Sequence, residues 1–252
     1  MPDLETLAVM YGPGNEQFRC VEASHSGTAG TEPVVRWLEY LRPGTFLDYG
    51  SGGGYLLREA AKRGWEAVGV EFDRNIAEKY SGQSGSRIIT DLAMLEPGFK
   101  ADLLHLGDVI EHLTDPDSQI PPVLDLLNEG GIFLAQGPLE SNPSLFLTLM
   151  QWARRLRGRK RVNMAPYHVM LATAKGQQAF FRRFGLAELN FKVSEVAWPA
   201  PESVSISDLG RPRTLALYCA RRLSRAVSRL RPGKWGNRYF YVGHWKRESA
   251  AG

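Results

Sequence analysis

The sequence feature that most restricts the possible folds is a glycine-rich turn between an apolar segment and a helical pattern. Residues 46–49 form a short apolar run, glycines follow at positions 50, 52 and 54, and residues 55–61 have the spacing of a helix. Glycine lets the backbone turn tightly and leaves N–H groups uncovered at the N-terminus of a helix. The stretch therefore predicts a strand, a ligand-binding loop and a helix.

The spacing of these glycines distinguishes between kinds of glycine-rich loop. Neither reading frame completes the G-x-G-x-x-G pattern of dinucleotide sites, and the Gly-Lys-Ser/Thr ending of a P-loop is missing. What remains is Asp48-x-Gly50-x-Gly52-x-Gly54, which resembles the first motif of class I S-adenosylmethionine-dependent methyltransferases. In that family the loop packs against the methionine part of the cofactor. The resemblance therefore implies S-adenosylmethionine as cofactor and these four residues in its site.

A second buried strand is predicted over residues 66–73, with Glu71 near its carboxyl end. A carboxylate at this position can accept hydrogen bonds from both hydroxyls of a ribose, as in other nucleoside-binding sheets. The segment also resembles the second motif of the family, which implies the same role. Glu71 and its neighbour Phe72 are therefore predicted to bind the cofactor, and the alternative for Glu71 is a solvated strand end.

A third short strand is predicted over residues 87–91, and it ends in Asp91. In similar methyltransferases an acid at this position accepts a hydrogen bond from the adenine amino group, and the next residue flanks the ring. The resemblance implies these roles for Asp91 and Leu92. Because Asp also begins turns for purely local reasons, a structural role is the alternative.

A polar cluster follows the fourth predicted strand, residues 101–107. The run Asp108-x-x-Glu111-His112-Leu-x-Asp-Pro closely resembles the fourth-strand motif of a methyltransferase subgroup that includes ubiquinone-biosynthesis, glycan and natural-product O-methyltransferases. Open parallel sheets bind ligands at the carboxyl ends of their strands, so Asp108 is predicted to lie in the cofactor site. Two adjacent ligands are too few to predict a metal, and His105 is expected to be a hydrogen-bonded core residue.

Two histidines are candidates for the catalytic base. Methyl transfer from a sulfonium is an in-line displacement, so the protein supplies alignment and, for a hydroxyl acceptor, a group that takes the proton. A histidine suits this task because its pKa lies near neutrality. His112 is the first candidate, and His168, which lies in the segment after the fifth strand, is the second. A structural role remains the alternative for both.

The remaining pattern predicts one α/β domain over residues 1–252. Strands that alternate with helical patterns indicate a Rossmann-like, doubly wound, mostly parallel sheet of about seven strands. Pro121 and Pro122 are expected to open a helix that Gly130 and Gly131 end, before a fifth strand. The expected parts are an N-terminal lead-in and lid (1–44), the cofactor-binding core (45–138), a substrate-cap insertion (139–185), and closing antiparallel strands (186–252) with a basic helical insertion (200–234).

Charge is distributed unevenly along the chain. Residues 151–252 hold 21 Lys and Arg against 5 Asp and Glu, whereas the first 150 residues are acidic overall. A basic half favours an anionic partner, although a solvated basic face is the alternative. A helix expected over residues 215–230 has apolar residues on one side and arginines elsewhere. It is predicted either to lie on an anionic membrane surface or to pack on its own domain.

The resemblance implies a methyltransferase that acts on a hydroxyl of a small molecule or glycan, and the basic half of the chain favours an anionic or lipid-linked acceptor. A nucleic-acid methyltransferase is the alternative, but base-flipping and RNA-binding signatures are missing from the sequence. A catalytically silent cofactor-binding module that docks to an anionic partner also stays open. The two cysteines match no disulfide framework, and the N-terminus lacks the pattern of a secretion signal, so the expected location is the cytoplasm or the inner membrane face.

Overall fold

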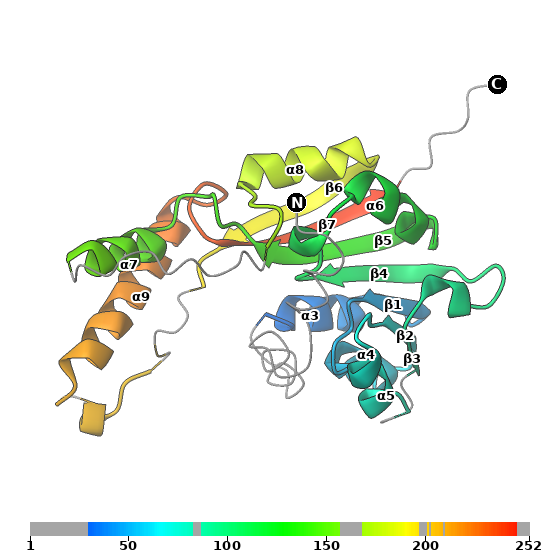
Figure 1. The fold of residues 1–252 in the computed structure, drawn as a ribbon, viewed down its shortest axis with the longest axis horizontal. Coiled ribbons are helices and arrows are strands. Elements are labelled where there is room, and N and C mark those ends of the chain that lie inside the picture. The colour runs from blue at the N-terminus through cyan, green and yellow to red at the C-terminus, as the bar shows by residue number, and fades with distance from the viewer. Residues whose placement is uncertain are drawn as a thin grey trace.

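The centre of the fold is a seven-stranded sheet in the order β3-β2-β1-β4-β5-β7-β6 (Figure 1). The structure, a computed structural model, describes residues 30–82, 87–156, 168–196, 201, 203–208 and 210–245. Strands β1 to β5 run parallel, whereas β7 is antiparallel to both of its neighbours. The predicted α/β fold with an antiparallel C-terminal pair is confirmed. The strands are β1 (Thr45–Tyr49), β2 (Glu66–Val70), β3 (Arg87–Ile89), β4 (Ala101–Gly107), β5 (Leu127–Pro138), β6 (Leu186–Ser194) and β7 (Arg238–Trp245).

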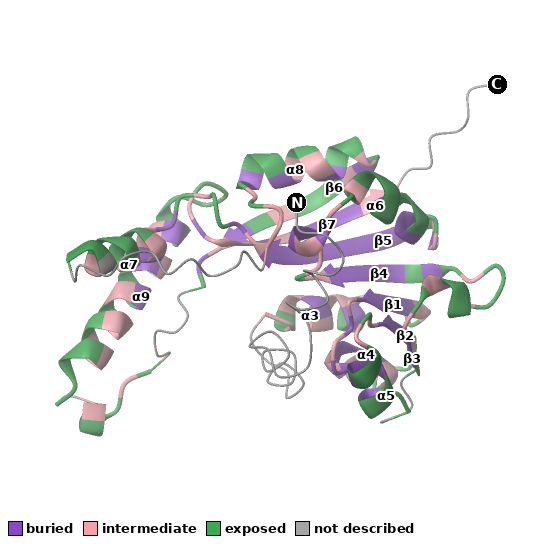
Figure 2. Ribbon diagram, in the orientation of Figure 1, coloured by how far each residue is buried: buried purple, intermediate pink, exposed green. Residues whose placement is uncertain are grey.

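Helices cover both faces of the sheet. One core lies under α3 (Glu32–Tyr40), α4 (Tyr55–Ala61) and α5 (Arg74–Tyr80), and the other lies under α6 (Pro116–Leu124) and α8 (Ala174–Arg183). Because successive strand residues point to opposite faces, Phe46 belongs to the first core and Leu47 to the second. The central strands are consequently buried along most of their length (Figure 2), which explains their largely apolar sequences.

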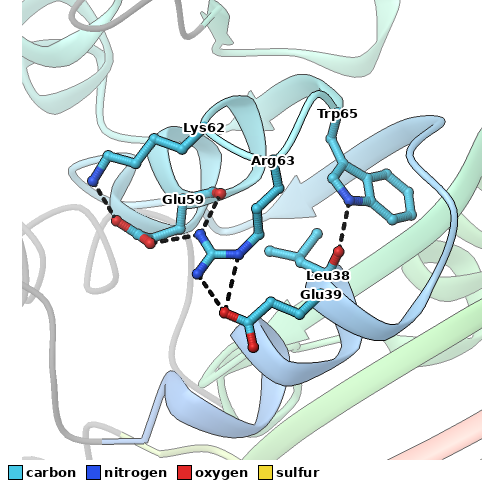
Figure 3. Close-up of polar contacts among 6 residues, drawn as sticks. All are labelled: Leu38, Glu39, Glu59, Lys62, Arg63 and Trp65. Atoms are coloured by element: carbon cyan, nitrogen blue, oxygen red, sulfur yellow. Dashed lines mark hydrogen bonds and ion pairs between the residues drawn. The ribbon is translucent and has the colours of Figure 1, made fainter.

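Polar contacts join α3 to the end of α4 (Figure 3). The Arg63 guanidinium lies between two carboxylates, 2.6 Å from Glu39 of α3 and 2.7 Å from Glu59 of α4. Next to it, the indole N–H of Trp65 donates to the carbonyl oxygen of Leu38, a buried hydrogen bond of 3.0 Å. Since α4 starts directly after the glycine loop, these contacts hold the helix that follows the loop against α3.

The predicted helix from Pro121 to Gly130 is wrong. The helix α6 begins earlier, at Pro116, and it contains Pro121 and Pro122 in its interior. β5 already starts at Leu127, which pairs with Ala101, and the register then shifts before Ile132 pairs with Leu103. Gly130 has φ +76° and lies in this irregular part of the strand. The glycine therefore accommodates a bulge inside β5 and does not end a helix.

Two further helices extend away from the sheet. α7 (Leu145–Leu156) and α9 (Pro212–Leu230) project together from one end of the molecule (Figure 1). Phe146 and Met150 of α7 pack on Leu217 and Ala220 of α9, in a small core of their own. Among the described residues we find no helix with the length and apolar character needed to cross a membrane. Residues 1–29 of the predicted lid and most of the basic run at 154–161 lie outside the described residues.

Candidate active site

The two motifs found in the sequence meet where the strand order reverses. β2 and β3 lie on one side of β1, and β4 and β5 lie on the other. Ligands of open parallel sheets bind at such a position, outside the carboxyl ends of the strands. The glycine loop (residues 50–54) follows β1, and the polar turn of residues 108–112 follows β4. A Cβ atom on Gly50 would collide with the side chain of Val109, so loop and turn are in contact.

The glycine loop has a backbone that only glycine adopts easily. Gly50, Gly52 and Gly54 have φ angles of +84°, +51° and +70°, all in the left-handed region. The N–H groups of Gly50 and Ser51 both donate to the carbonyl oxygen of Val70, at 2.8 and 3.0 Å. These bonds fix the loop to the end of β2, directly before Glu71, which is predicted to bind the ribose.

Glu71 is held between the glycine loop and its own turn. Its Oε2 accepts the N–H of Gly52 at 2.8 Å, and its Oε1 accepts the N–H of Asp73 at 2.9 Å. Burial raises the pKa of Glu71, although both backbone hydrogen bonds oppose this effect. A carboxylate oxygen can accept more than one hydrogen bond, so both oxygens can still receive a ribose hydroxyl. The predicted contact of Glu71 with the ribose stays a prediction.

The other predicted adenosine contacts have more local roles. Phe72 is 61% exposed, and its ring meets the edge of Tyr49 at a centroid distance of 5.3 Å. Oδ1 of Asp91 accepts the N–H of Ala93 at 2.8 Å and so begins the short helix η2 (Leu92–Met94), which is the structural alternative. Leu92 is half-buried and packs on the core. Their cofactor contacts stay predictions.

A buried polar pair lies within the sheet below the loop. Asp48 of β1 and His105 of β4 are paired residues of adjacent strands, and Oδ1 of Asp48 lies 2.7 Å from Nδ1 of His105. Both side chains are nearly inaccessible to solvent. The expectation that His105 is a hydrogen-bonded core residue is confirmed. Asp48 thus has a partner in the core, and its predicted part in cofactor binding is not tested by this contact.

Asp108 is fixed by a residue that sequence reasoning missed. It has a left-handed backbone (φ +54°), and its two carboxylate oxygens accept from the two Nη atoms of Arg238, each at 2.7 Å. Arg238 begins β7, 130 residues further along the chain, so no local pattern could have indicated the pair. This two-point contact orients the start of the turn that carries Glu111 and His112.

The two candidate bases lie next to each other. The rings of His112 and His168 meet edge to face, with centroids 4.9 Å apart. The segment that carries His168 is anchored to the turn, because the N–H groups of Val169 and Met170 both donate to the carbonyl oxygen of Glu111. Although 56 positions separate the histidines in sequence, the structure brings them together as one polar group.

His168 has a carboxylate partner that was also missed. Its Nδ1 lies 2.9 Å from Oε1 of Glu140, a residue just beyond the end of β5. The hydrogen bond with Glu140 raises the pKa of His168, and this outweighs the opposing effect of burial. A carboxylate on one ring nitrogen fixes the tautomer and orientation and leaves Nε2 for a second partner. His168 is thereby better equipped as a base than the sequence indicated.

Glu111 completes the group as a buried carboxyl. Its Oε1 has no hydrogen-bond partner, and burial, reinforced by the charge of Asp108, raises its pKa to about 8. Donor atoms of Glu111, His112 and His168 lie within 4.8 Å of one another. Two imidazoles and a carboxylate could hold a divalent cation, which would also satisfy the unpartnered oxygen. The sequence prediction had no metal here because His168 is remote along the chain.

The match with a known protein family covers the region that contains these features. Residues 31–189 match a family model described as a methyltransferase domain. The chain belongs to this methyltransferase family. The match runs from the start of α3 into β6, so it includes the glycine loop, Glu71, the turn after β4 and His168. The predicted class I S-adenosylmethionine-dependent methyltransferase is confirmed.

Curated relatives of this methyltransferase are similar over a part of their length. It is 34% identical over 107 residues to a ubiquinone biosynthesis O-methyltransferase of Ruegeria sp. (strain TM1040), a stretch of 40% of this chain and 43% of that protein. It is 30% identical over 118 residues to the protein of the same name from Paramagnetospirillum magneticum, 44% of this chain and 45% of that one. The chain spans less than half the length of these relatives.

Solved structures share the fold of this methyltransferase at low identity. Magnesium protoporphyrin IX methyltransferase from Synechocystis PCC 6803, with bound SAH, has a TM-score of 0.55 and 15% identity, over 95% of this chain and 93% of that one. The [4+2]-cyclase SpnF has a TM-score of 0.57 and 14% identity, over 97% of both chains. Family and bound SAH together indicate S-adenosylmethionine as the cofactor. Since a cyclase has the same fold, the reaction must be argued from the site.

Proposed function

We propose that this methyltransferase transfers the methyl group of S-adenosylmethionine to a hydroxyl of a small organic molecule, with His168 as the base. The observation that carries the proposal is the Glu140–His168 pair, 2.9 Å apart, beside the turn that touches the glycine loop. A hydroxyl acceptor must lose a proton during transfer, whereas a carboxylate acceptor has none to lose. A site with an oriented imidazole therefore favours a hydroxyl.

The chemical step needs few groups from the protein. The acceptor oxygen attacks the methyl carbon in line with the sulfur, the carbon–sulfur bond breaks, and S-adenosylhomocysteine leaves as a neutral thioether. The hydroxyl proton passes to Nε2 of His168, while Glu140 stabilises the imidazolium that forms. His112, edge to face with His168 at 4.9 Å, limits how the ring can turn. His112 is then a positioning residue, and His168 takes the role of catalytic base that the sequence assigned first to His112.

A basic hollow supports a small anionic acceptor. A depression of about 680 Å³ lies between β6, β7 and α9, within the size range of small-molecule sites. Its lining includes Lys192, Arg225, Arg229 and Arg238, together with the acids Glu32 and Glu195. Arg238 also holds Asp108 and so connects the hollow with the turn after β4. The names of the curated relatives, which are O-methyltransferases, agree with methylation of an oxygen atom.

The proposal is tested by incubating the protein with methyl-labelled S-adenosylmethionine and a panel of phenolic, glycan and carboxylic acceptors. Mass spectrometry then locates the added methyl group. We expect label on the oxygen of a hydroxyl in an anionic small molecule, and much slower labelling by His168→Ala. Label only on a carboxylate, a nitrogen or a nucleic acid would contradict the proposal. If S-adenosylmethionine binds but no acceptor is labelled even in extract, the chain acts as a binding module.

A further inference from the structure

In its C-terminal half, from Arg221 onwards, helix α9 buries polar residues and exposes two leucines. If it packed on its own domain through its apolar side, Leu223 and Leu230 would be covered. Instead they are 55% and 78% exposed, whereas Ser224, Ser228 and Arg221 are buried. A leucine side chain that stays in water forgoes roughly 2 kcal/mol of burial free energy. The helix therefore packs on its own domain, as the alternative considered from the sequence has it, but Leu223 and Leu230 on its apolar side stay uncovered.

Hydrogen bonds hold α9 in this orientation. The hydroxyl oxygen of Ser224 accepts the N–H of Phe146 in α7 at 3.0 Å. The hydroxyl of Ser228 donates to the carbonyl oxygen of Trp235 at 2.8 Å, in the segment that leads into β7. Turning the helix to bury its leucines would strand these buried polar groups without partners, which is costly. The outward apolar side is thus fixed by the fold.

Helix α7, the partner of α9, also exposes an apolar stripe. Leu149, Trp152 and Leu156 are 37%, 61% and 83% exposed. They are three and four residues apart, which places them on one side of a helix. An adjacent side, with Phe146 and Met150, packs on α9. In Figure 2 the two helices stand clear of the body, and we call this pair the α7–α9 arm.

The charge of the arm has one sign. Its two helices contain seven arginines and neither Asp nor Glu. The exposed Arg222 and Arg229 directly precede the exposed Leu223 and Leu230. The exposed surface of α9 therefore has a positive charge next to an apolar side chain at two places. The arginines are Arg154, Arg155, Arg213, Arg221, Arg222, Arg225 and Arg229.

We propose that the α7–α9 arm binds the anionic surface of a lipid membrane. Leucine and tryptophan side chains can enter the boundary between head groups and acyl chains, and arginines there pair with lipid phosphates. Trp152 is of the residue type enriched at that boundary. A second copy of the arm would bring like charges together, which opposes self-association. A nucleic acid would match the arginines but would leave the exposed leucines in water.

The test is flotation of the full chain with vesicles of neutral phosphatidylcholine and with vesicles that also contain phosphatidylglycerol. We expect binding only to the anionic vesicles, with weaker binding as the salt concentration rises. No cofactor or acceptor is added, so the outcome does not depend on methyl transfer. Equal binding to both vesicle types, or none to either, would overturn the proposal.

Paired variants separate the arm from general charge and hydrophobicity. The double variant R222S/R229S should lower the partition coefficient about thirtyfold, from roughly a fivefold loss for each of the two surface arginines. L223S/L230S should also lower it at least tenfold. The matched controls, R36S/R74S for charge and L171S/L189S for exposed leucines, lie off the arm and should bind as the wild type.

The same variants distinguish a membrane from RNA and from a second copy of the chain as the partner of the arm. Circular dichroism is used first to show that each variant is folded. If the arm variants bind anionic vesicles as tightly as their controls, the proposal fails. It also fails if R222S/R229S mainly reduces binding to RNA, or if L223S/L230S converts a dimer in light scattering to a monomer while vesicle binding is unchanged. These outcomes would assign the arm to RNA or to a second copy of the chain.

Discussion

Removing the charge of Glu140 tests the proposed base most specifically. In Glu140→Gln the side chain keeps its length and an oxygen that can accept from Nδ1 of His168, 2.9 Å away in the wild type. Only the negative charge is lost. The Glu140 side chain is 42% exposed and that of His168 is 25% exposed, so solvent screens the pair. We therefore expect a contribution of about 1 kcal/mol, less than for a buried charged hydrogen bond.

That energy predicts about a fivefold loss of turnover at the alkaline plateau if the charge acts fully on the imidazolium in the transition state. The pH dependence of turnover provides a second, independent test. His168 must be neutral to accept a proton, so turnover rises with pH through its pKa. Because Glu140 raises this pKa in the wild type, its loss lowers the pKa, and the rising limb should move to lower pH.

The assay is turnover of a labelled acceptor between pH 5 and pH 9 at saturating cofactor. Glu188→Gln is the matched control, since Glu188 also accepts a side-chain hydrogen bond, from Gln178, but lies on β6. His168→Ala should lose roughly a hundredfold or more. If Glu140→Gln leaves both the plateau and the rising limb unchanged, Glu140 does not assist the base. If His168→Ala turns over like the wild type, His168 is not the base.

Four further results are expected. Gly50→Ala should weaken cofactor binding at least tenfold in calorimetry, because its φ is +84° and a Cβ atom would collide with Val109; normal affinity would refute the loop geometry. Glu71→Ala should weaken it similarly. The pKa of Glu111 is about 8 in the folded state and 4.5 in the unfolded chain, so its contribution to the free energy of unfolding is full below pH 4.5 and is lost as the pH rises to 8. At pH 9 Glu111→Gln should therefore be more stable than the wild type by on the order of 2 kcal/mol in denaturant titrations. Turnover should survive EDTA, whereas a loss that divalent ions restore would make the histidines metal ligands.

The parts of the site that the sequence predicted are those held by local structure. The turn at residues 50–54 needs glycine at specific positions, and the carboxylate of Glu71 follows directly after a strand, so both leave a readable pattern. Fold class was predictable for the same reason, since buried parallel strands alternate with helices. The error at Pro121 arose because a bulge with Gly130 and the end of a helix leave the same residues in the sequence.

The parts that the sequence missed depend on contacts between distant segments. Arg238 meets Asp108 only because β7 inserts between β5 and β6, which no local pattern indicates. Glu140 and His168 come together across the segment that contains α7. The orientation of α9 was also unreadable, because its amphipathic pattern does not reveal which side the buried serines anchor. Hydrogen bonds between distant segments, and not the local helix and strand propensities of the sequence, decide these features.

The central claim is that the glycine loop after β1 and Glu71 after β2 together hold the adenosyl cofactor. A crystal structure of the protein with S-adenosylhomocysteine tests it most directly. We expect density for the methionine part against Gly50 and Gly52, with both ribose hydroxyls on the Glu71 carboxylate and the sulfur facing His168. A cofactor found elsewhere, or bound without contact to Glu71, would contradict it.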